Sequence, residues 1–456
     1  MQENSFLSVF KNPGFLNLWV NQILVQLSYN SLNFALIIWV FKLTDSTVAV
    51  STLLAAVYLP AVLFGLFAGV IVDIVDRKYI ILAIDFLLAI LFFSLIIFKG
   101  SFPAILIIAF LINTLSQFYT PAESSAIPMI VKKPQLITAN SIFSTTLYVC
   151  FLLGFGLSGP LMDRVGINYL FALGGGLLTI ATILALFFPS IVSKADEQGQ
   201  RLIFALQKKD FKTVKMVGFY EIQETFKLVR GHLAVLFCIL ILAGVQVVIG
   251  VLAVLIPSFF EKVLHIRATN ASYVLIMPLG LGMVVGGFLI GKLGHKLPKR
   301  ILVGRGVLLS GLLFFLVGVA PFITPVISYL HVSRPLPFIY QLPVSTVIAI
   351  GAFLLGIAMV SIIVPSQTVL QESTPEEDRG KVFAVLGAAM YGLSLLPVFF
   401  AGILADIFGA TPLLIGLGGF ISIIGLFSLK PEFFFEEAHL PAHIRQFLGL
   451  GHWKKD

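Results

Sequence analysis

Two carboxylic acids, Asp85 and Glu123, lie inside long apolar stretches of this chain. An ionised carboxylate is costly away from water, and inside a membrane it is normally paired or functional. Asp85 lies six residues after Tyr79, which places it roughly 9 Å along a helix that starts there. Two roles fit this position: a structural pair with a basic residue, or proton carriage.

The basic partners available to Asp85 are Arg77, Lys78 and the turn at 379–381. Glu123 follows Thr120 and Pro121, near the end of its apolar stretch. It is either a charge that extends to the inner membrane rim or a residue that couples ion movement to function. Both carboxylates are therefore coupling candidates.

Amide and hydroxyl side chains recur at helical spacing in two of the apolar stretches. Residues three or four positions apart lie on one face of a helix. The first stripe contains Gln22, Gln26, Asn30 and Asn33, and the second contains Asn113, Gln117, Thr120 and Ser124. Amides that face lipid lack hydrogen-bond partners, at a cost of several kcal/mol each. Both stripes are thus expected to face the interior, either around a cavity or in hydrogen bonds between helices.

The elements that must position these residues are transmembrane helices. The chain of 456 residues is 58% hydrophobic and 11% charged, whereas a soluble domain has roughly 25% charged residues. A helix of about 20 apolar residues crosses the hydrocarbon core, and the apolar runs reach this length. Membrane barrels have short alternating segments instead. The composition therefore predicts an all-α membrane protein.

Twelve such runs predict twelve transmembrane helices. The proline-rich segment 321–342 between two of them is expected to be a loop. The predicted spans are 16–42, 48–72, 79–98, 104–127, 139–162, 168–188, 232–258, 271–293, 301–320, 343–369, 382–405 and 411–429.

The basic residues predict the orientation of these spans. With the N-terminus in the cytoplasm, 24 of the 30 Lys and Arg residues lie inside or at an inner helix end. The six outside are Lys42, Lys99, Arg164, Lys262, Arg267 and Arg334. This distribution follows the positive-inside rule. We therefore expect both termini in the cytoplasm, and the net charge of +8 reflects topology.

A long polar stretch at 189–231 divides the spans six and six. Phe219, Ile222, Phe226 and Val229 fall within it at helical spacing, which predicts a short amphipathic helix on the inner membrane surface. The expected organisation is a six-helix half at 1–188, a cytoplasmic linker at 189–231, a second six-helix half at 232–430 and a cytoplasmic tail at 431–456.

The second, fifth, eighth and eleventh spans end alike. Each has a small residue, three apolar residues, an Asp or Gly, and another Asp or Gly three positions later. These segments begin at Gly69, Gly159, Gly287 and Gly402. A pattern that returns in every third span predicts two pseudo-symmetric six-helix halves built from three-helix repeats.

Nested three-helix repeats in two six-helix halves are an architecture of transporters, and this sequence resembles the major facilitator superfamily. The segment from Gly69 through Asp73 and Asp76 to Arg77 and Lys78 is similar to the superfamily signature between its second and third helices. It departs from the usual pattern because Asp76 stands where a glycine is expected. The resemblance covers all twelve spans.

Two further segments resemble a bacterial branch of this superfamily that includes enterobactin-exporter-like and macrolide-efflux-like proteins. One runs from Pro128 to Ser141 and the other from Gln371 to Phe383. The arginine that proton-coupled drug exporters carry in their fourth helix has no counterpart, since no Arg occurs between Lys99 and Lys132. The coupling ion therefore stays open.

The resemblance implies a conformational latch. The carboxylate of Asp73 is expected to face the N-terminus of the eleventh helix, whose dipole stabilises a negative charge. Loss of this contact favours the inward-open state. The alternative is that these charges only anchor the topology. The latch set is Gly69, Asp73, Asp76, Arg77, Lys78, Arg379, Gly380 and Lys381.

The resemblance also implies a central cavity lined by the first, fourth, seventh and tenth spans. The seventh and tenth spans offer chiefly Gln246 and Ser361 as polar groups. One polar wall and one apolar wall suit an amphipathic substrate. The predicted cavity residues are Gln22, Gln26, Asn30, Asn33, Asn113, Gln117, Thr120, Gln246 and Ser361.

We expect a secondary active transporter that exports amphipathic small organic molecules, drug-like or siderophore-like, by alternating access. The proton gradient is the expected energy source. Alternatives with the same fold are a lysophospholipid flippase and a nutrient importer. An alternative of another class is a non-transporting membrane receptor or assembly factor.

Enzymatic activity is not expected. The chain has no GxxxxGK[ST] loop for nucleotides, and its two cysteines, Cys150 and Cys238, lie in apolar runs without metal-ligand spacing. We expect no cofactor, no metal and no nucleic acid. The expected partners are the small-molecule substrate and the lipid bilayer, for a monomer in the plasma (inner) membrane.

Overall fold

The computed structural model describes residues 9–190, 233–293, 298–329, 344–374 and 379–429. Regular structure in this part of the chain is helical throughout. The predicted amphipathic helix of the linker and the predicted tail lie outside the described residues.

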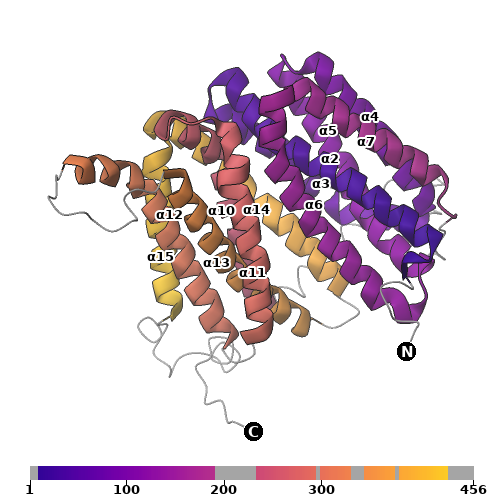
Figure 1. Cartoon of the computed structure of the whole chain (residues 1–456). Helices are drawn as coiled ribbons and strands as arrows, with labels where there is room; N and C mark the ends of the chain where they lie inside the picture. The colour runs from indigo at the N-terminus through magenta and orange to yellow at the C-terminus, as the bar shows by residue number, and fades with distance from the viewer. Residues whose placement is uncertain (1–8, 191–232, 294–297, 330–343, 375–378, 430–456) are drawn as a thin grey trace, which may run out of the picture. The chain divides into compact units, whose positions relative to one another are not determined.

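Twelve helical segments are long and apolar enough to cross a membrane, which confirms the predicted class and number of spans (Figure 1). Those up to residue 190 are α2 (Pro13–Thr44), α3 (Thr47–Ile74), α4 (Arg77–Phe98), α5 (Phe102–Ile130), α6 (Leu136–Val165) and α7 (Ile167–Leu186). Those that follow are α10 (Leu233–Ser258), α11 (Met277–Leu293), α12 (Lys299–Tyr329), α13 (Val344–Glu372), α14 (Arg379–Phe408) and α15 (Ala410–Leu429).

Short 3₁₀ and π helices occur at two places in the described part of the chain. The 3₁₀ helix η2 (Lys133–Gln135) precedes α6. Between α10 and α11 lie the π-helix η3 (Phe259–Val263), the 3₁₀ helix η4 (Ala268–Asn270) and the π-helix η5 (Ser272–Ile276). The eighth span therefore starts with η4 and η5 and continues into α11.

The prediction of a loop at 321–342 is wrong for its first part, because α12 continues to Tyr329. The segment Pro321–Tyr329 contains two prolines, and proline in a transmembrane helix is tolerated where neighbouring groups replace the lost hydrogen bond. Residues 330–343 lie outside the described part of the chain.

The chain divides into two compact units. The first contains Met1–Asp45 and Thr52–Phe226, and the second contains Ser46–Ser51 and Lys227–Asp456. The start of α3 therefore groups with the second unit, and the rest of that helix with the first.

Three helix pairings recur in the two units. In the first unit α2 packs against α6, and α4 packs against α7 and α5. In the second unit α10 packs against α14, and α12 packs against α15 and α13. Counted in spans, these are the first with the fifth, the third with the sixth and the third with the fourth. This correspondence agrees with the predicted pseudo-symmetry.

The repeated span ends have a conformational reason in two of the four cases. Gly166 ends α6 with φ +83°, and Gly409 ends α14 with φ +85°. This left-handed region penalises side chains with a Cβ, so glycine is favoured at a helix end. Asp76, at the same repeat position after α3, has φ −58° and needs no glycine.

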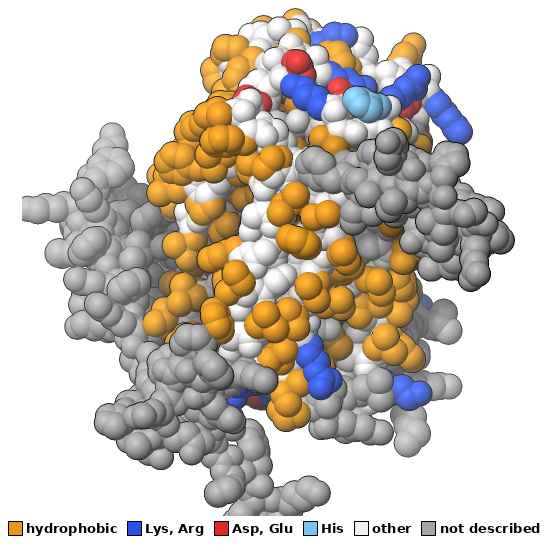
Figure 2. All heavy atoms as spheres, turned by 90° about the vertical axis from the view of Figure 1, so that its left-hand side faces the viewer, with side chains coloured by type: hydrophobic (Ala, Val, Ile, Leu, Met, Phe, Trp, Pro, Cys, Tyr) orange, Lys and Arg blue, Asp and Glu red, His pale blue; other side chains and the backbone are white. Residues whose placement is uncertain are grey.

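The face of the molecule drawn in Figure 2 has a broad band of hydrophobic side chains, with charged side chains gathered at its two ends. Exposed apolar residues of the second unit include Val284, Phe288 and Phe420, with 62%, 73% and 63% of their surface accessible. Apolar patches this extensive are unfavourable in water and mark a surface that meets another phase. The protein is a multi-pass membrane protein.

Candidate functional site

The amides of the first predicted stripe occupy different surroundings on α2. Gln22 is 1% exposed, and its Nε2 donates to the backbone oxygen of Phe143 in α6 at 3.3 Å. Asn30 is also buried and donates to the backbone oxygen of Gln26 at 2.8 Å. Gln26 and Asn33 are half-buried. Gln22 thus joins helices, whereas Gln26 and Asn33 keep partial access.

The side chains of the second stripe, on α5, also differ in their exposure. Asn113 is buried and accepts a hydrogen bond from the Tyr29 hydroxyl of α2 at 2.6 Å. Gln117 is half-buried, and Thr120 is exposed. The Tyr29–Asn113 bond therefore joins the two polar helices, while Gln117 and Thr120 of the stripe remain accessible.

A second polar group of the first unit is fully enclosed by helices. Asn21 of α2 donates from Nδ2 to Asp85 Oδ2 of α4 at 2.7 Å and to the backbone oxygen of Ala181 in α7 at 3.0 Å. Tyr119 of α5 is 2.8 Å from Asn21 Oδ1 and 3.1 Å from Glu123 Oε1. We call Asn21, Asp85, Tyr119 and Glu123 the buried polar cluster.

The cluster brings the two predicted coupling residues into one network. Asp85 is 0% exposed and Glu123 is 4% exposed. Glu123 therefore does not extend to a solvated rim. The hydrogen-bond partner of Asp85 is Asn21 of α2 rather than one of the predicted basic residues, because Asp85 lies two turns into α4.

Two members of the cluster, Asn21 and Tyr119, were not among the predicted site residues. Tyr119 precedes Glu123 by four positions, which is the spacing of neighbours on a helix face. That spacing is a usable signal. Asn21 adjoins Gln22 but falls outside the stripe, so its role depends on a contact between helices that the sequence of α2 alone does not reveal.

The structure describes only some of the residues of the predicted latch. Asp76 is the N-cap of α4, where its side chain accepts from the Lys78 backbone nitrogen at 2.9 Å and from the Ser190 hydroxyl at 2.6 Å. Arg77 is 2% exposed and donates from Nε to Ser125 Oγ of α5 at 3.3 Å.

Gly69 lies in α3, and a Cβ added to it would meet open space. The side chains of Asp73, Arg379 and Lys381 and the surroundings of Gly380 lie outside the described residues. The latch therefore stays a prediction.

Asp406, from the repeated segment of the eleventh span, caps the start of α3. Its Oδ1 accepts from the Thr47 backbone nitrogen at 2.8 Å and from the Thr47 hydroxyl, and its Oδ2 accepts from the Ser46 hydroxyl at 2.6 Å and the Val48 nitrogen at 3.2 Å. All these residues belong to the second unit. Asp406 is thus a side-chain cap for the N-terminus of α3.

In the second unit Gln246 of α10 and Ser361 of α13 are half-buried. The Ser361 hydroxyl donates to the backbone oxygen of Ile357 in its own helix at 2.8 Å. The hydrogen-bonding capacity of Ser361 is thus partly used by the backbone of its own helix.

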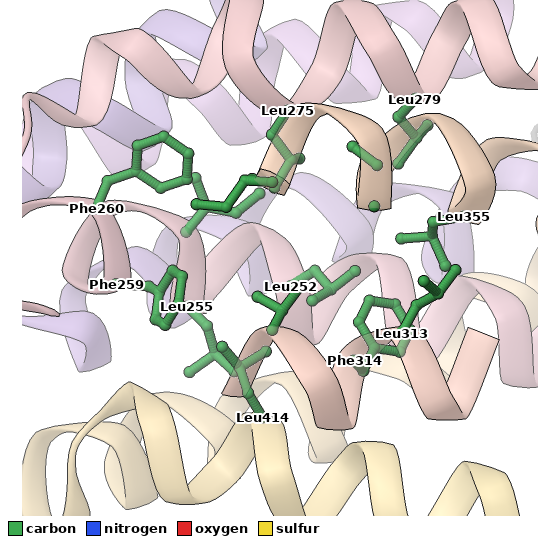
Figure 3. A pocket seen from close by; sticks show the side chains of 15 residues that line it. Leu252, Leu255, Phe259, Phe260, Leu275, Leu279, Leu313, Phe314, Leu355 and Leu414 are labelled. Carbon is green, nitrogen blue, oxygen red and sulfur yellow. The ribbon is translucent and has the colours of Figure 1, made fainter. Parts of the chain in front are cut away.

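A small apolar cavity of about 50 Å³ lies inside the second unit. Figure 3 shows leucine and phenylalanine side chains from several helices that converge on it. Drug-sized ligands occupy pockets of about 300–1,000 Å³. The cavity is too small for such a ligand and is better described as a gap in the packing. Its labelled lining residues are Leu252, Leu255, Phe259, Phe260, Leu275, Leu279, Leu313, Phe314, Leu355 and Leu414.

No group of three or more His, Cys, Asp or Glu side chains with metal-binding geometry occurs among the described residues. The chemistry available in the first unit is thus hydrogen bonding and proton binding by the buried polar cluster, next to helices that carry half-buried amides.

Curated relatives match most of the chain at low identity. Macrolide efflux protein A of Streptococcus pyogenes is 22% identical over 67% of this chain and 73% of its own length. The multidrug efflux pump Tap of Mycolicibacterium fortuitum is 25% identical over 77% of this chain and 79% of its own length.

Solved structures share the fold. The POT family transporter PepTSo superposes with a TM-score of 0.69 at 14% identity, over 97% of this chain and 99% of the other. The nucleoside transporter NupG gives a TM-score of 0.67 at 12% identity, over 93% and 100%. The family model of the Major Facilitator Superfamily matches residues 18–391. The chain therefore belongs to the major facilitator superfamily of transporters.

Proposed function

We propose that the protein exports amphipathic small organic molecules from the cell by alternating access, driven by the proton gradient. The observation that carries this proposal is the match to efflux proteins, one for macrolides and one for multiple drugs, over two thirds or more of the chain. Macrolide-like compounds, with a large apolar body and a few polar groups, are the first substrate class to test.

The distribution of polar side chains supports an amphipathic substrate. Half-buried Gln26, Asn33 and Gln117 and exposed Thr120 offer hydrogen-bonding groups on the first unit. The corresponding helices of the second unit offer mainly Gln246 and Ser361. An amphipathic substrate could place its polar groups against such amides and its apolar side against the apolar residues.

The proposed mechanism moves the two six-helix units relative to each other. The Asp73 latch, with Arg379, Gly380 and Lys381 as its expected partners, is part of this proposal. A carboxylate at a helix N-terminus is stabilised by the helix dipole, so the latch would bias one of two conformations. The proposed setting is the plasma membrane, with both termini in the cytoplasm and a monomer as the working unit.

The experiment is efflux from a drug-sensitive bacterial host. Cells that express the wild-type protein should retain less of a fluorescent amphipathic dye, and tolerate more macrolide, than cells with empty vector. A protonophore should abolish both differences. Asp73→Asn should transport less at equal expression.

Other outcomes redirect the proposal. Unchanged retention of every dye and macrolide would remove amphipathic drugs as substrates. Uptake of a lysophospholipid or a nutrient in the same cells would then favour a flippase or an importer. Full transport by Asp73→Asn would contradict the proposed role of Asp73 as a latch.

A further inference from the structure

The residues of the buried polar cluster form a chain of hydrogen bonds, and the donor and acceptor of each bond can be assigned. It joins Asn21, Tyr119 and Glu123 across α2 and α5, and it continues from Asn21 to Asp85 on α4 and to the Ala181 carbonyl on α7. These four helices pack together within the first unit (Figure 1). Asn21, Asp85, Tyr119 and Glu123 are each at most 4% exposed, so surrounding water does not complete the chain.

The orientation of the Asn21 amide is fixed by its neighbours. A backbone carbonyl only accepts hydrogen bonds, so the group of Asn21 that lies 3.0 Å from the Ala181 oxygen must be the NH₂ group. Its second proton points to Asp85 Oδ2 at 2.7 Å. The remaining atom, Oδ1, has no proton and faces the Tyr119 hydroxyl.

Tyr119 has one hydroxyl proton and two oxygen neighbours. Asn21 Oδ1 at 2.8 Å can only accept, so the shorter contact uses that proton. The 3.1 Å contact with Glu123 Oε1 then requires a second proton. The atom that can supply it is the Glu123 carboxyl, which donates to the Tyr119 oxygen when it is protonated. The complete chain therefore contains a neutral Glu123.

An ionised Glu123 would rearrange the same atoms. Tyr119 would turn its proton to the carboxylate, and Asn21 Oδ1 would lose its donor inside a closed site. An unsatisfied buried acceptor costs about 1–3 kcal/mol. A negative charge on Glu123 would also stand near Asp85, which is bonded to the same asparagine. Both effects oppose ionisation in the conformation described here.

The charges that surround the cluster are few. α2 and α7 contribute the amide of Asn21 and a backbone carbonyl, and α4 contributes Asp85 and, two turns earlier, Arg77. Arg77 is buried and bonded to Ser125. From α6 the thiol of Cys150 lies within electrostatic range of Glu123. Asp85 Oδ1 is buried and has no hydrogen-bond partner among the described residues.

We propose that Glu123 is the proton-binding site of this transporter, and that Tyr119 and Asn21 couple its protonation to the packing of α2. Binding of a proton completes the chain and holds α2, α4, α5 and α7 together. Release of the proton to water breaks the Tyr119–Asn21 bond and favours a conformation in which Glu123 is hydrated. Tyr119 and Asn21 are positioning residues in this scheme. The inference rests on the proposed proton-driven transport.

Each residue has a different role in the hydrogen-bond chain, so matched variants can separate these roles. Glu123→Gln presents an NH₂ group that can donate to Tyr119 permanently, and it should behave as a protein locked in the protonated form. Tyr119→Phe removes the relay but leaves the acid. Glu372→Gln is the control, because that carboxylate is 60% exposed and pairs with Lys299 at the surface.

The test combines infrared difference spectroscopy with two transport assays on purified protein in liposomes. Wild type should show the carbonyl band of a protonated carboxylic acid that disappears at high pH. Glu123→Gln should lack this band. Tyr119→Phe should retain it at a shifted frequency, because the acid has lost its acceptor, and Glu372→Gln should match wild type.

In the transport assays Glu123→Gln should exchange substrate across the membrane at a rate near that of wild type. It should lose at least ten-fold in accumulation driven by a pH gradient. An unchanged carbonyl band in Glu123→Gln, or full gradient-driven accumulation by that variant, would overturn the inference. Absence of substrate exchange by the wild type would instead count against the proposed function, and the infrared result would still decide where the proton binds.

Discussion

At the residue scale, the interior of the first unit is held by hydrogen bonds that each serve more than one helix. Asn21 alone satisfies Asp85, the Ala181 carbonyl and Tyr119. In a medium of low dielectric constant such bonds are strong, and the loss of one partner leaves the others unsatisfied. The effect of a substitution therefore depends on how many partners lie on other helices, more than on how polar the side chain is.

Two asparagines of α2 test this statement. Asn21→Ala removes the hydrogen bonds to three buried groups and should lower the free energy of unfolding by at least about 2 kcal/mol. Asn33→Ala should have a much smaller effect, because Asn33 is half-buried and donates only to Tyr29 of its own helix. Thermal unfolding in detergent, followed by a thiol-reactive dye at buried Cys150, measures both. Equal melting temperatures for the two variants would contradict the argument.

Asp406 gives a second prediction at this scale. An N-cap side chain contributes typically about 1 kcal/mol, and its negative charge adds to this at the positive end of a helix. Asp406→Ala should therefore lower the melting temperature measured at buried Cys238, whereas Asp406→Asn should retain most of the stability because its amide oxygen still accepts. A loss of the same size in both variants would show that charge, and not capping, is what matters there.

Asp85 and Glu123 were recognisable from the sequence because a carboxylic acid inside an apolar run is costly unless it is paired or functional. The partner of Asp85 was not. Asn21, 64 positions from Asp85, meets it because α2 and α4 both pack against α7. Helical spacing gives the face of a residue relative to its own helix, and it does not give the rotation of that helix against its neighbours.

At the element scale, glycines set how closely the helices of the second unit approach. A Cβ on Gly282 of α11 would lie 1.9 Å from the Phe353 oxygen of α13, and a Cβ on Gly356 of α13 would lie 2.1 Å from the Leu279 oxygen. Small residues allow this close backbone contact in membranes, where packing rather than the hydrophobic effect joins helices. The α11–α13 contact therefore requires glycine at these positions.

Two glycines of α13 make a matched pair. Gly351 lines the apolar cavity, and a Cβ there would meet nothing within 4 Å. Gly351→Ala should stabilise the second unit by about 0.5–1 kcal/mol, because alanine has the better helix propensity and its methyl group meets no neighbour. Gly356→Ala should destabilise it by about 1–3 kcal/mol, because the backbone of α11 must move. The stability of the second unit is measured by thermal unfolding, followed by the reaction of the thiol-reactive dye with buried Cys238. A gain in stability for Gly356→Ala would contradict the close contact.

The spans were well predicted because lipid leaves little choice. Apolar runs of sufficient length must form helices, and all twelve are present. Element ends were less predictable. The prolines after residue 320 indicated a loop, yet α12 continues to Tyr329, because a proline inside a transmembrane segment does not by itself end the helix. Gly166 and Gly409 mark true ends, since both have positive φ.

At the scale of the whole molecule, the two units share three helix pairings but differ in the polar groups that their described residues carry. The basic residues predict that the N-terminus is cytoplasmic. This orientation decides which loops face the cytoplasm, so it needs its own test.

Ser101 and Lys132 lie just before and just after α5, and both are exposed. A membrane-impermeant maleimide should label Ser101→Cys in intact cells and Lys132→Cys only after permeabilisation. The native cysteines, each 2% exposed, should contribute little background. The reverse pattern of labelling would invert the proposed topology.

The central claim, proton-driven export of amphipathic compounds, is tested most directly by the accumulation of a radiolabelled macrolide in proteoliposomes with an acidic interior. Protein-free liposomes with the same gradient are the necessary control, because weak bases accumulate in them passively. The account predicts accumulation above that control, lost when a protonophore collapses the gradient. Accumulation equal to that of protein-free liposomes, for macrolides and for other amphipathic drugs, would contradict it.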